Sequence, residues 1–556
     1  MRKTIVILMT CIIVLLLGFS GFRGYELWKQ NHWMALAKSF AAKGDVHNEF
    51  LALEQVLKSN GRNLEACRMM AGLAEASHSA SAIIWRKEVV ELDPNSINDR
   101  LALAQTGIFS HDFATAENAL AGVNAAGKNT AAYYSVAATL ALAMNKPDDA
   151  QADFAQAVRL DPSNPSPQLN LAVLELHGTN SLDRQEARIT LQRIGMSSTN
   201  NLIRDQAKRE LIMDSLQFGD NSTALSLSKE LASQKNSAFT DKLLRLDVLR
   251  KTRSEEYEYT MASYERDAAN NSDELYQMAT WLMEGNSPAQ TLSWLRSLPA
   301  NTQTNMPAAV LIAQCEIQVQ DWRGLQNSVS KQSWGKLEFT RHAYLSYALR
   351  EQGLYDASKA EWDVAVRAAN GQDLTLTTLF HFAVQCKWQD EAQQILWTIV
   401  NNYPQEQWAS KELASGLYES GSTRPLMQLF GVQVNRNPND LDAKNDLALT
   451  ALLLRAQELN PYELARNVYQ QAPTNSYYAC TYAFSLYLQG KNADALKIMQ
   501  QLTAADLKNN STDGYYGLIL RVAGDKTDAN AYLTRSLKGQ LLPEERTMFQ
   551  QALNSL

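Results

Sequence analysis

Residues 131–164 form the pattern that most restricts how this chain can fold. The segment reads AAYYSVAATLALAMNKPDDAQADFAQAVRLDPSN. Its apolar residues recur three or four positions apart, as on one face of a helix, first at Tyr134, Ala137, Ala138 and Ala141 and then at Ala150, Phe154 and Ala157. Turn formers at residues 145–149 separate the two stretches, and Pro162 ends the second. Because one such helix pair cannot bury its apolar face alone, neighbouring pairs must stack.

This pattern resembles the tetratricopeptide repeat (TPR) family. Units of that family carry a large residue at position 4, small residues at 8, 20 and 27, Gly at 15, an aromatic residue at 24 and Pro at 32. Counted from Ala131, the unit departs at position 11, where Ala141 replaces a large residue. It also departs at position 15, where Asn145 replaces Gly but tolerates the geometry of a turn. The resemblance implies an all-α fold, a right-handed α-solenoid of antiparallel helix pairs.

Other segments fit the same frame. Glycines fall at position 15 of several units, at Gly44, Gly219, Gly353, Gly490 and Gly524. Prolines close others, at Pro94, Pro404 and Pro438. Such self-similarity is the signature of a repeat array, and we expect about 14 or 15 units in all. The predicted segments are a membrane anchor (1–29), an N-terminal TPR array (30–237), degenerate helical repeats (238–338), a C-terminal TPR array (339–540) and a capping helix (541–556).

The anchor prediction rests on Thr4–Phe22, which contains no charged residue. About 20 apolar residues span a bilayer as a helix. A signal peptide usually has a shorter apolar core and a small-x-small cleavage site, and residues 18–20 are a poor match to such a site. We favour an uncleaved transmembrane helix, with a cleaved signal as the alternative. Arg2 and Lys3 favour a cytoplasmic N-terminus, which would place the array outside the cytoplasm, in the periplasm of a Gram-negative source.

Composition and motif content argue against several classes of function. The net charge is −7 and no basic run suits a phosphate backbone, so nucleic acid is not an expected partner. The five cysteines are widely spaced without a CxxC pair, and we interpret them as small buried side chains. The seven histidines show no metal-ligand spacing, and no catalytic motif occurs. We therefore expect no cofactor, no metal and no enzyme activity.

The TPR resemblance implies where a partner would bind. Stacked repeats curve, and the first helix of each pair lines the concave side, with positions 2, 5, 9, 12 and 13 facing it in this family. In the C-terminal half these positions include Tyr347, Arg350, His381, Trp408, Lys411, Tyr418, Tyr477, Phe484, Tyr487 and Arg521. Aromatic residues and Arg dominate interface energetics, so we predict an aromatic, partly cationic groove for a peptide segment or helix. The alternative is that these aromatic residues pack against adjacent helices as core.

Two functions fit these observations. The first is a membrane-tethered scaffold that binds other proteins, in envelope assembly or secretion. The second is a module that handles a polymer or glycan, as TPR arrays do in exopolysaccharide export systems. Groove geometry separates them. A continuous aromatic track flanked by Asp and Asn would favour a glycan, whereas separate apolar pockets with a basic rim would favour a peptide.

Overall fold

The computed structural model describes residues 28–285, 287–330, 332–369, 371–503 and 505–555. The regular secondary structure in these ranges is helical and includes no strand. The predicted all-α architecture is therefore confirmed. The chain divides into two compact units, Met1–Trp281 and Leu282–Leu556. The apolar segment Thr4–Phe22 lies outside the described residues, and its role as an anchor stays a prediction. None of the helices that are described is long and apolar enough to cross a bilayer.

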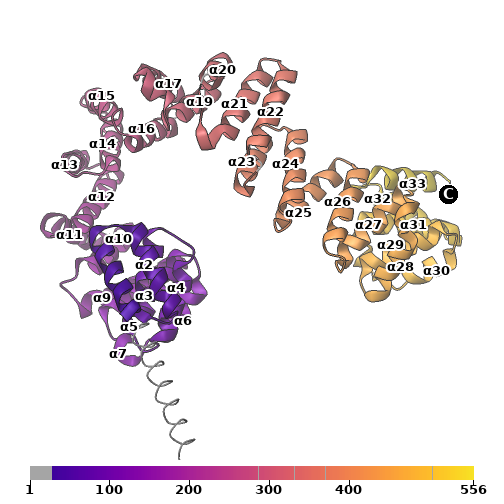
Figure 1. Ribbon diagram of the computed structural model, residues 1–556, viewed down its shortest axis with the longest axis horizontal. Coiled ribbons are helices and arrows are strands. Elements are labelled where there is room, and N and C mark those ends of the chain that lie inside the picture. Colours follow the sequence, from indigo (N-terminus) through magenta and orange to yellow (C-terminus); the bar gives the residue numbers. More distant parts are fainter. Residues whose placement is uncertain (1–27, 286, 331, 370, 504, 556) are drawn as a thin grey trace, which may run out of the picture. The chain divides into compact units, whose positions relative to one another are not determined.

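The first unit is a succession of helices joined by short turns (Figure 1). In chain order they are residues 28–43, α2 (Val46–Ser59), α3 (Leu64–Ala76), α4 (Ala82–Leu92), α5 (Ile97–Phe109), α6 (Phe113–Ala121), α7 (Ala125–Lys128), α8 (Ala131–Ala143), α9 (Pro147–Leu160), α10 (Pro165–His177), α11 (Ser181–Ser197), α12 (Asn201–Gln217), α13 (Asn221–Ala232), α14 (Phe239–Lys251), α15 (Tyr257–Ala268) and most of α16 (Ser272–Glu284). Consecutive helices pack against each other, as α8 does on α9 and α10 on α11.

The second unit continues the same succession. Its α-helices are α17 (Pro288–Ser297), α18 (Ala300–Thr304), α19 (Ala308–Gln318), α20 (Trp322–Ser330), α21 (Glu338–Glu351), α22 (Tyr355–Ala369), α23 (Asp373–Gln385), α24 (Gln389–Asn402), α25 (Gln407–Glu419), α26 (Thr423–Arg436), α27 (Leu441–Leu453), α28 (Pro461–Gln471), α29 (Ser476–Leu488), α30 (Asn492–Met499), α31 (Asn510–Ala523), α32 (Lys526–Ser536) and α33 (Pro543–Asn554). Short 3-10 turns occur at Gly335–Leu337, Gln457–Leu459 and Asp506–Lys508. Paired helices lie side by side, most plainly α21 and α22 (Figure 1).

A left-handed residue ends the first helix of most pairs. Positive φ angles recur about every 34 residues, at Gly44, His78, His111, Asn145, Gly219, Arg253, Gln320, Gly353, Lys387, Gly421, Arg455, Gly490 and Gly524. This is position 15 of the predicted frame, and Asn145 adopts φ +60° there as expected. The sequence repeat is therefore a repeat of backbone geometry, and it persists where glycine is absent.

The small-residue positions carry the packing inside each pair. In the 131–164 unit, Ala138 on α8 and Ala150 and Ala157 on α9 are fully buried, and Phe154 fills the space beside them. Small side chains let two helix backbones approach closely, while the large ring excludes voids. Capping residues begin the helices: the carboxylate of Asp112 accepts the backbone N–H of Thr115, and Asp220 does the same for Thr223.

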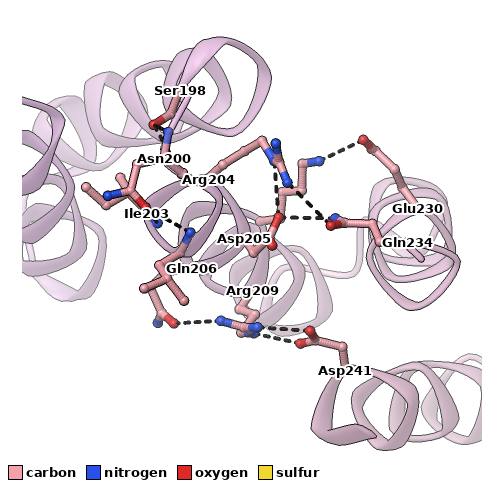
Figure 2. Close-up of polar contacts among 12 residues, drawn as sticks. Ser198, Asn200, Ile203, Arg204, Asp205, Gln206, Arg209, Glu230, Gln234 and Asp241 are labelled. Carbon is pink, nitrogen blue, oxygen red and sulfur yellow. Dashed lines mark hydrogen bonds and ion pairs between the residues drawn. The ribbon is translucent and has the colours of Figure 1, made fainter. Parts of the chain in front are cut away.

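Charged side chains tie one pair to the next. On α12, Arg209 donates two hydrogen bonds to the buried carboxylate of Asp241 on α14, at 2.7 and 2.9 Å (Figure 2). Lys208, from the same helix, pairs within its own repeat with Glu230 on α13 at 2.7 Å. Arg68 on α3 likewise pairs with Asp99 on α5. Because such a bidentate Arg–carboxylate pair has one geometry, it fixes the register between successive repeats.

Candidate peptide-binding groove

The predicted groove residues lie on first helices of the second unit, from α21 to α31. They divide into three groups with different surroundings. Tyr347 and Arg350 on α21 lie in an aromatic cluster, while His381, Trp408 and Lys411 border open surface on α23 and α25. The remaining five lie on α25, α29 and α31, the part of the unit where the last helix, α33, is also found: Tyr418, Tyr477, Phe484, Tyr487 and Arg521.

The aromatic cluster on α21 is largely structural. The Tyr347 ring lies 5.1 Å from the Trp322 ring and 5.7 Å from the Trp388 ring. The guanidinium of Arg350 lies 4.0 Å above the centre of Trp388, and it hydrogen-bonds Glu391 of the following pair. Its charge is thus already balanced inside the repeat array. Arg350 therefore positions neighbouring helices rather than offering a free cation.

His381, Trp408 and Lys411 form the accessible part. Trp408 is half-buried, and its ring lies 5.6 Å from the ring of Phe380. Its indole N–H donates to Oε2 of Glu406 at 3.0 Å, which fixes the ring orientation. His381 and Lys411 are exposed. Trp408 thus offers an oriented apolar surface, with the Lys411 cation on the same helix and the His381 imidazole on α23.

The last helix packs on α31 and α32, and the segment at its N-terminal end also contacts earlier repeats. At its N-terminal end, the hydroxyl of Tyr418 on α25 donates to the carbonyl of Gln540 at 3.2 Å. Thr423 donates to Glu544 at 2.5 Å. A hollow of about 490 Å³ lies between α33 and the first helices α27 and α29, lined by Leu452, Leu453, Arg455, Phe484, Leu488, Pro543, Glu544, Thr547, Met548 and Gln551. The concave positions of these repeats thus face a segment of the same chain.

The contact between α33 and α31 is tight and buried. A Cβ atom on Gly514 would meet the Phe549 ring at 2.1 Å, so only glycine fits there. Tyr515 donates to Oε1 of Glu545 at 2.6 Å, and Glu545 also accepts the backbone N–H of Leu542. Burial raises the pKa of the Glu545 carboxyl above its ordinary value. A helix so fixed is an integral part of this unit.

The predictions for three residues of this region need correction. Phe484 is 1% exposed and its ring lies 4.3 Å from that of Tyr515, so it is a core residue at the edge of the hollow beside α33. Tyr418 and Arg521 face segments of the same chain, with Arg521 donating to Oγ of Ser555 at 2.9 Å. The physical reason is that α33 fills the space that the repeat frame left empty. The buried N-cap Leu542 and the buried helix residues Glu545, Phe549 and Ala552 were the signal that sequence reasoning missed.

The last two predicted residues, both on α29, differ from each other. Tyr477 is 61% exposed at the start of the helix. Tyr487 is half-buried and its ring stacks on Phe484 at 6.4 Å. Tyr477 is therefore available to a partner, whereas Tyr487 contributes to the packing around α33.

The described residues contain no group of three His, Cys, Asp or Glu side chains placed to hold a metal ion. Four cysteines, Cys67, Cys315, Cys386 and Cys480, are free thiols, and three of these are buried. Burial raises the pKa of Cys480 to about 12, so its thiol stays protonated at neutral pH. The exposed side chains of His381, Lys411 and Tyr477, together with the Trp408 ring, offer a surface for binding.

These features place the chain in the class of helical-repeat proteins with TPR-like helix pairs. No protein-family model matches it, and no curated protein sequence matches it significantly. Among solved structures it is similar to that of pilF from Pseudomonas aeruginosa, with TM-score 0.32, 14% identity, and 41% of this chain and 99% of that one covered. It is also similar to the Cut9–Hcn1 structure of the APC/C, with TM-score 0.30, 11% identity, and 82% of this chain and 96% of that one covered. A third similar structure is a tetratricopeptide repeat protein from Parabacteroides merdae, with TM-score 0.26, 13% identity, and 44% of this chain and 96% of that one covered.

Proposed function

We propose that this chain is a protein-interaction scaffold whose concave groove binds helical segments of partner proteins. The observation that carries the proposal is the packing of α33 against α31, together with the hydrogen bonds that join residues 540–544 to α25 and α26. Its buried residues, Glu545, Phe549 and Ala552, fall three or four positions apart on one helix face. This is the spacing by which an amphipathic helix docks in a hydrophobic groove. The chain itself thus supplies an example of a segment that this concave surface accepts.

A partner would bind next to α33, on the accessible part formed by His381, Trp408 and Lys411. The oriented Trp408 ring suits an apolar anchor residue, because large aromatic side chains in fixed positions carry much of the energy of an interface. The Lys411 cation suits an acidic residue one helical turn away from that anchor. The expected partner segment is therefore an amphipathic helix with an acidic flank.

The membrane tether is part of the same proposal. The uncharged run Thr4–Phe22 would hold the array at a membrane, with Arg2 and Lys3 on the cytoplasmic side and the repeats outside the cytoplasm. A scaffold in that place would gather partner proteins at the membrane, in envelope assembly or secretion.

Affinity capture from native membranes tests the proposal, with the full-length chain as bait. We expect stoichiometric protein partners that are lost with Lys411→Glu and Trp408→Ala. Tyr355→Ala is the matched control, because Tyr355 is an exposed aromatic residue on α22, a second helix. Retention of every partner by both groove variants, with normal thermal unfolding, would refute the groove. Capture of a glycan without any protein would favour the polymer-handling alternative.

A further inference from the structure

Helix α11 carries an outer face unlike those of its neighbours. Leu182, Ile189 and Met196 are 70%, 60% and 85% exposed, at intervals of seven residues. The inner face, with Ala187 and Leu191, is fully buried against the array. On α13, the next second helix, exposed positions are polar instead, for example Lys229 and Glu230. The apolar residues on α11 therefore form an uncovered stripe.

Two charged residues complete this stripe. Glu186 and Arg193 are exposed and alternate with the three apolar residues, in the order Leu182, Glu186, Ile189, Arg193, Met196. At 100° per residue these five positions fall within about 80° of arc. Arg193 donates to Gln168 at 2.6 Å, whereas Glu186 has no hydrogen bond or ion pair with any described residue. On the inner side of the helix, Arg188 pairs with Asp214 at 2.6 Å.

The order of the stripe is self-complementary when two copies run antiparallel. A twofold axis at Ile189 places Ile189 against its own copy and Leu182 against Met196 of the second copy. The same axis places Glu186 within one residue of the level of Arg193, about 1.5 Å along the helix. The two side chains are close enough to form an ion pair, and symmetry makes this pair twice. In a parallel arrangement, each charge would instead meet its own kind. An isologous interface requires this property, that one patch complements itself.

We propose that α11 is a homodimerisation surface, which pairs antiparallel with α11 of a second copy of this chain. The stripe is neutral in sum, with one acid and one base, which suits a second copy better than an anionic lipid surface. The stripe from Leu182 to Met196 covers 15 residues and is about 21 Å long. A single helix face of this length buries less area than the roughly 800 Å² per partner of a standard stable interface. The expected dimer is therefore weak and reversible, with a dissociation constant in the micromolar range.

Charge exchange gives the decisive experiment, by sedimentation velocity of the full-length chain in density-matched detergent. Glu186→Arg alone and Arg193→Glu alone should each weaken self-association about tenfold, because each homodimer then holds two like-charge contacts. An equimolar mixture of the two variants should recover it, because every contact in the mixed dimer is again between opposite charges. Ile189→Arg should leave monomer only, with Ile84→Arg, on the exposed surface of α4, as the matched control.

Cysteine pairs then test the direction. A mixture of Leu182→Cys and Met196→Cys chains should form a disulfide-linked dimer under mild oxidation, and Leu182→Cys alone should not. All substituted residues are exposed, so the fold is expected to persist. Failure of the charge-exchanged mixture to associate, or dimerisation that Ile189→Arg leaves unchanged, would overturn the proposal. Efficient cross-linking of Leu182→Cys to itself would overturn the antiparallel arrangement.

Discussion

The phenol of Tyr515 donates a 2.6 Å hydrogen bond to Oε1 of Glu545, and both side chains are buried. This bond joins α31 of the last repeat to α33 in its groove. A carboxyl group removed from water must find partners within the protein. Glu545 finds the tyrosine hydroxyl and the backbone N–H of Leu542. The fixed place of α33 therefore depends on a polar contact as well as on apolar packing.

Tyr515→Phe should lower the free energy of unfolding by about 1–3 kcal/mol, because it leaves an oxygen of Glu545 without its donor. Chemical denaturation of the second unit's transition would measure the change. Tyr516→Phe is the matched control, since this neighbouring hydroxyl has no partner among the described residues, and it should change stability by less than about 0.5 kcal/mol. Equal effects of the two substitutions would show that the bond to Glu545 contributes nothing.

Phe549→Ala should release α33 from the concave surface. The ring is fully buried against Gly514 and Tyr515, and its loss should cost about 3–5 kcal/mol. Hydrogen exchange of residues 543–554 should then accelerate far more than exchange in α21. The exposed residue Gln550 provides the control, since Gln550→Ala should leave the exchange of α33 unchanged. Continued protection of α33 in the Phe549 variant would contradict the assigned packing.

Position 15 of the repeats offers a stabilising substitution. Lys387 adopts φ +58°, a conformation that costs an L-residue about 1–2 kcal/mol more than glycine. Lys387→Gly should therefore raise the free energy of unfolding by about 0.5–1 kcal/mol. The gain is smaller than the strain that is relieved, because glycine also increases the conformational entropy of the unfolded chain. Gly490→Ala, at φ +74° in another repeat, should have the opposite effect. Thermal unfolding midpoints that shift in the same direction for both would argue against a left-handed turn at this position.

Arg209→Ala should cost about 3 kcal/mol, because it leaves the buried carboxylate of Asp241 without its bidentate partner. Urea unfolding of the first unit would measure it. The matched control is Lys38→Ala, which breaks an exposed pair with Glu65 at 2.7 Å and should cost less than about 1 kcal/mol. If both substitutions have the same small effect, the tie between α12 and α14 is not a source of stability.

Asp446 should make stability depend on pH. Burial, together with the charges of Asp442 and Asp440, raises the pKa of Asp446 to about 6. The folded chain then binds this proton more tightly than the unfolded chain, whose aspartates titrate near 3.9. Folding is thus penalised above pH 6, and the penalty disappears as the pH falls through 6 toward 4. Asp446→Asn should stabilise the chain by about 1–3 kcal/mol at pH 7.5 and hardly at all at pH 4. An equal gain at both values would exclude titration of Asp446 as the cause.

The sequence alone determined the repeating unit. The spacing of small and large residues from Tyr134 to Pro162 specified two helices and the turn between them, because helix periodicity and turn chemistry are local properties. The turn at Asn145 followed for the same reason. The stretch 238–338 resisted this reasoning, since its small-residue signature is weak. Its helices α14 to α20 nevertheless form, with left-handed turns at Arg253 and Gln320.

Only the tertiary structure decided what the concave surface holds. Periodicity placed Phe484 and Tyr418 on first helices facing the groove, and it could not show that residues 540–549 reach them across more than 60 residues of chain. Whether an aromatic side chain is core or binding surface depends on which distant segment covers it. The exposed stripe from Leu182 to Met196 could not be predicted for a related reason. Whether an apolar residue belongs to the core or to an exposed surface is known only once its burial is known. The local sequence pattern determines where the helices lie in the chain, and long-range packing determines which helix faces are buried and which are exposed.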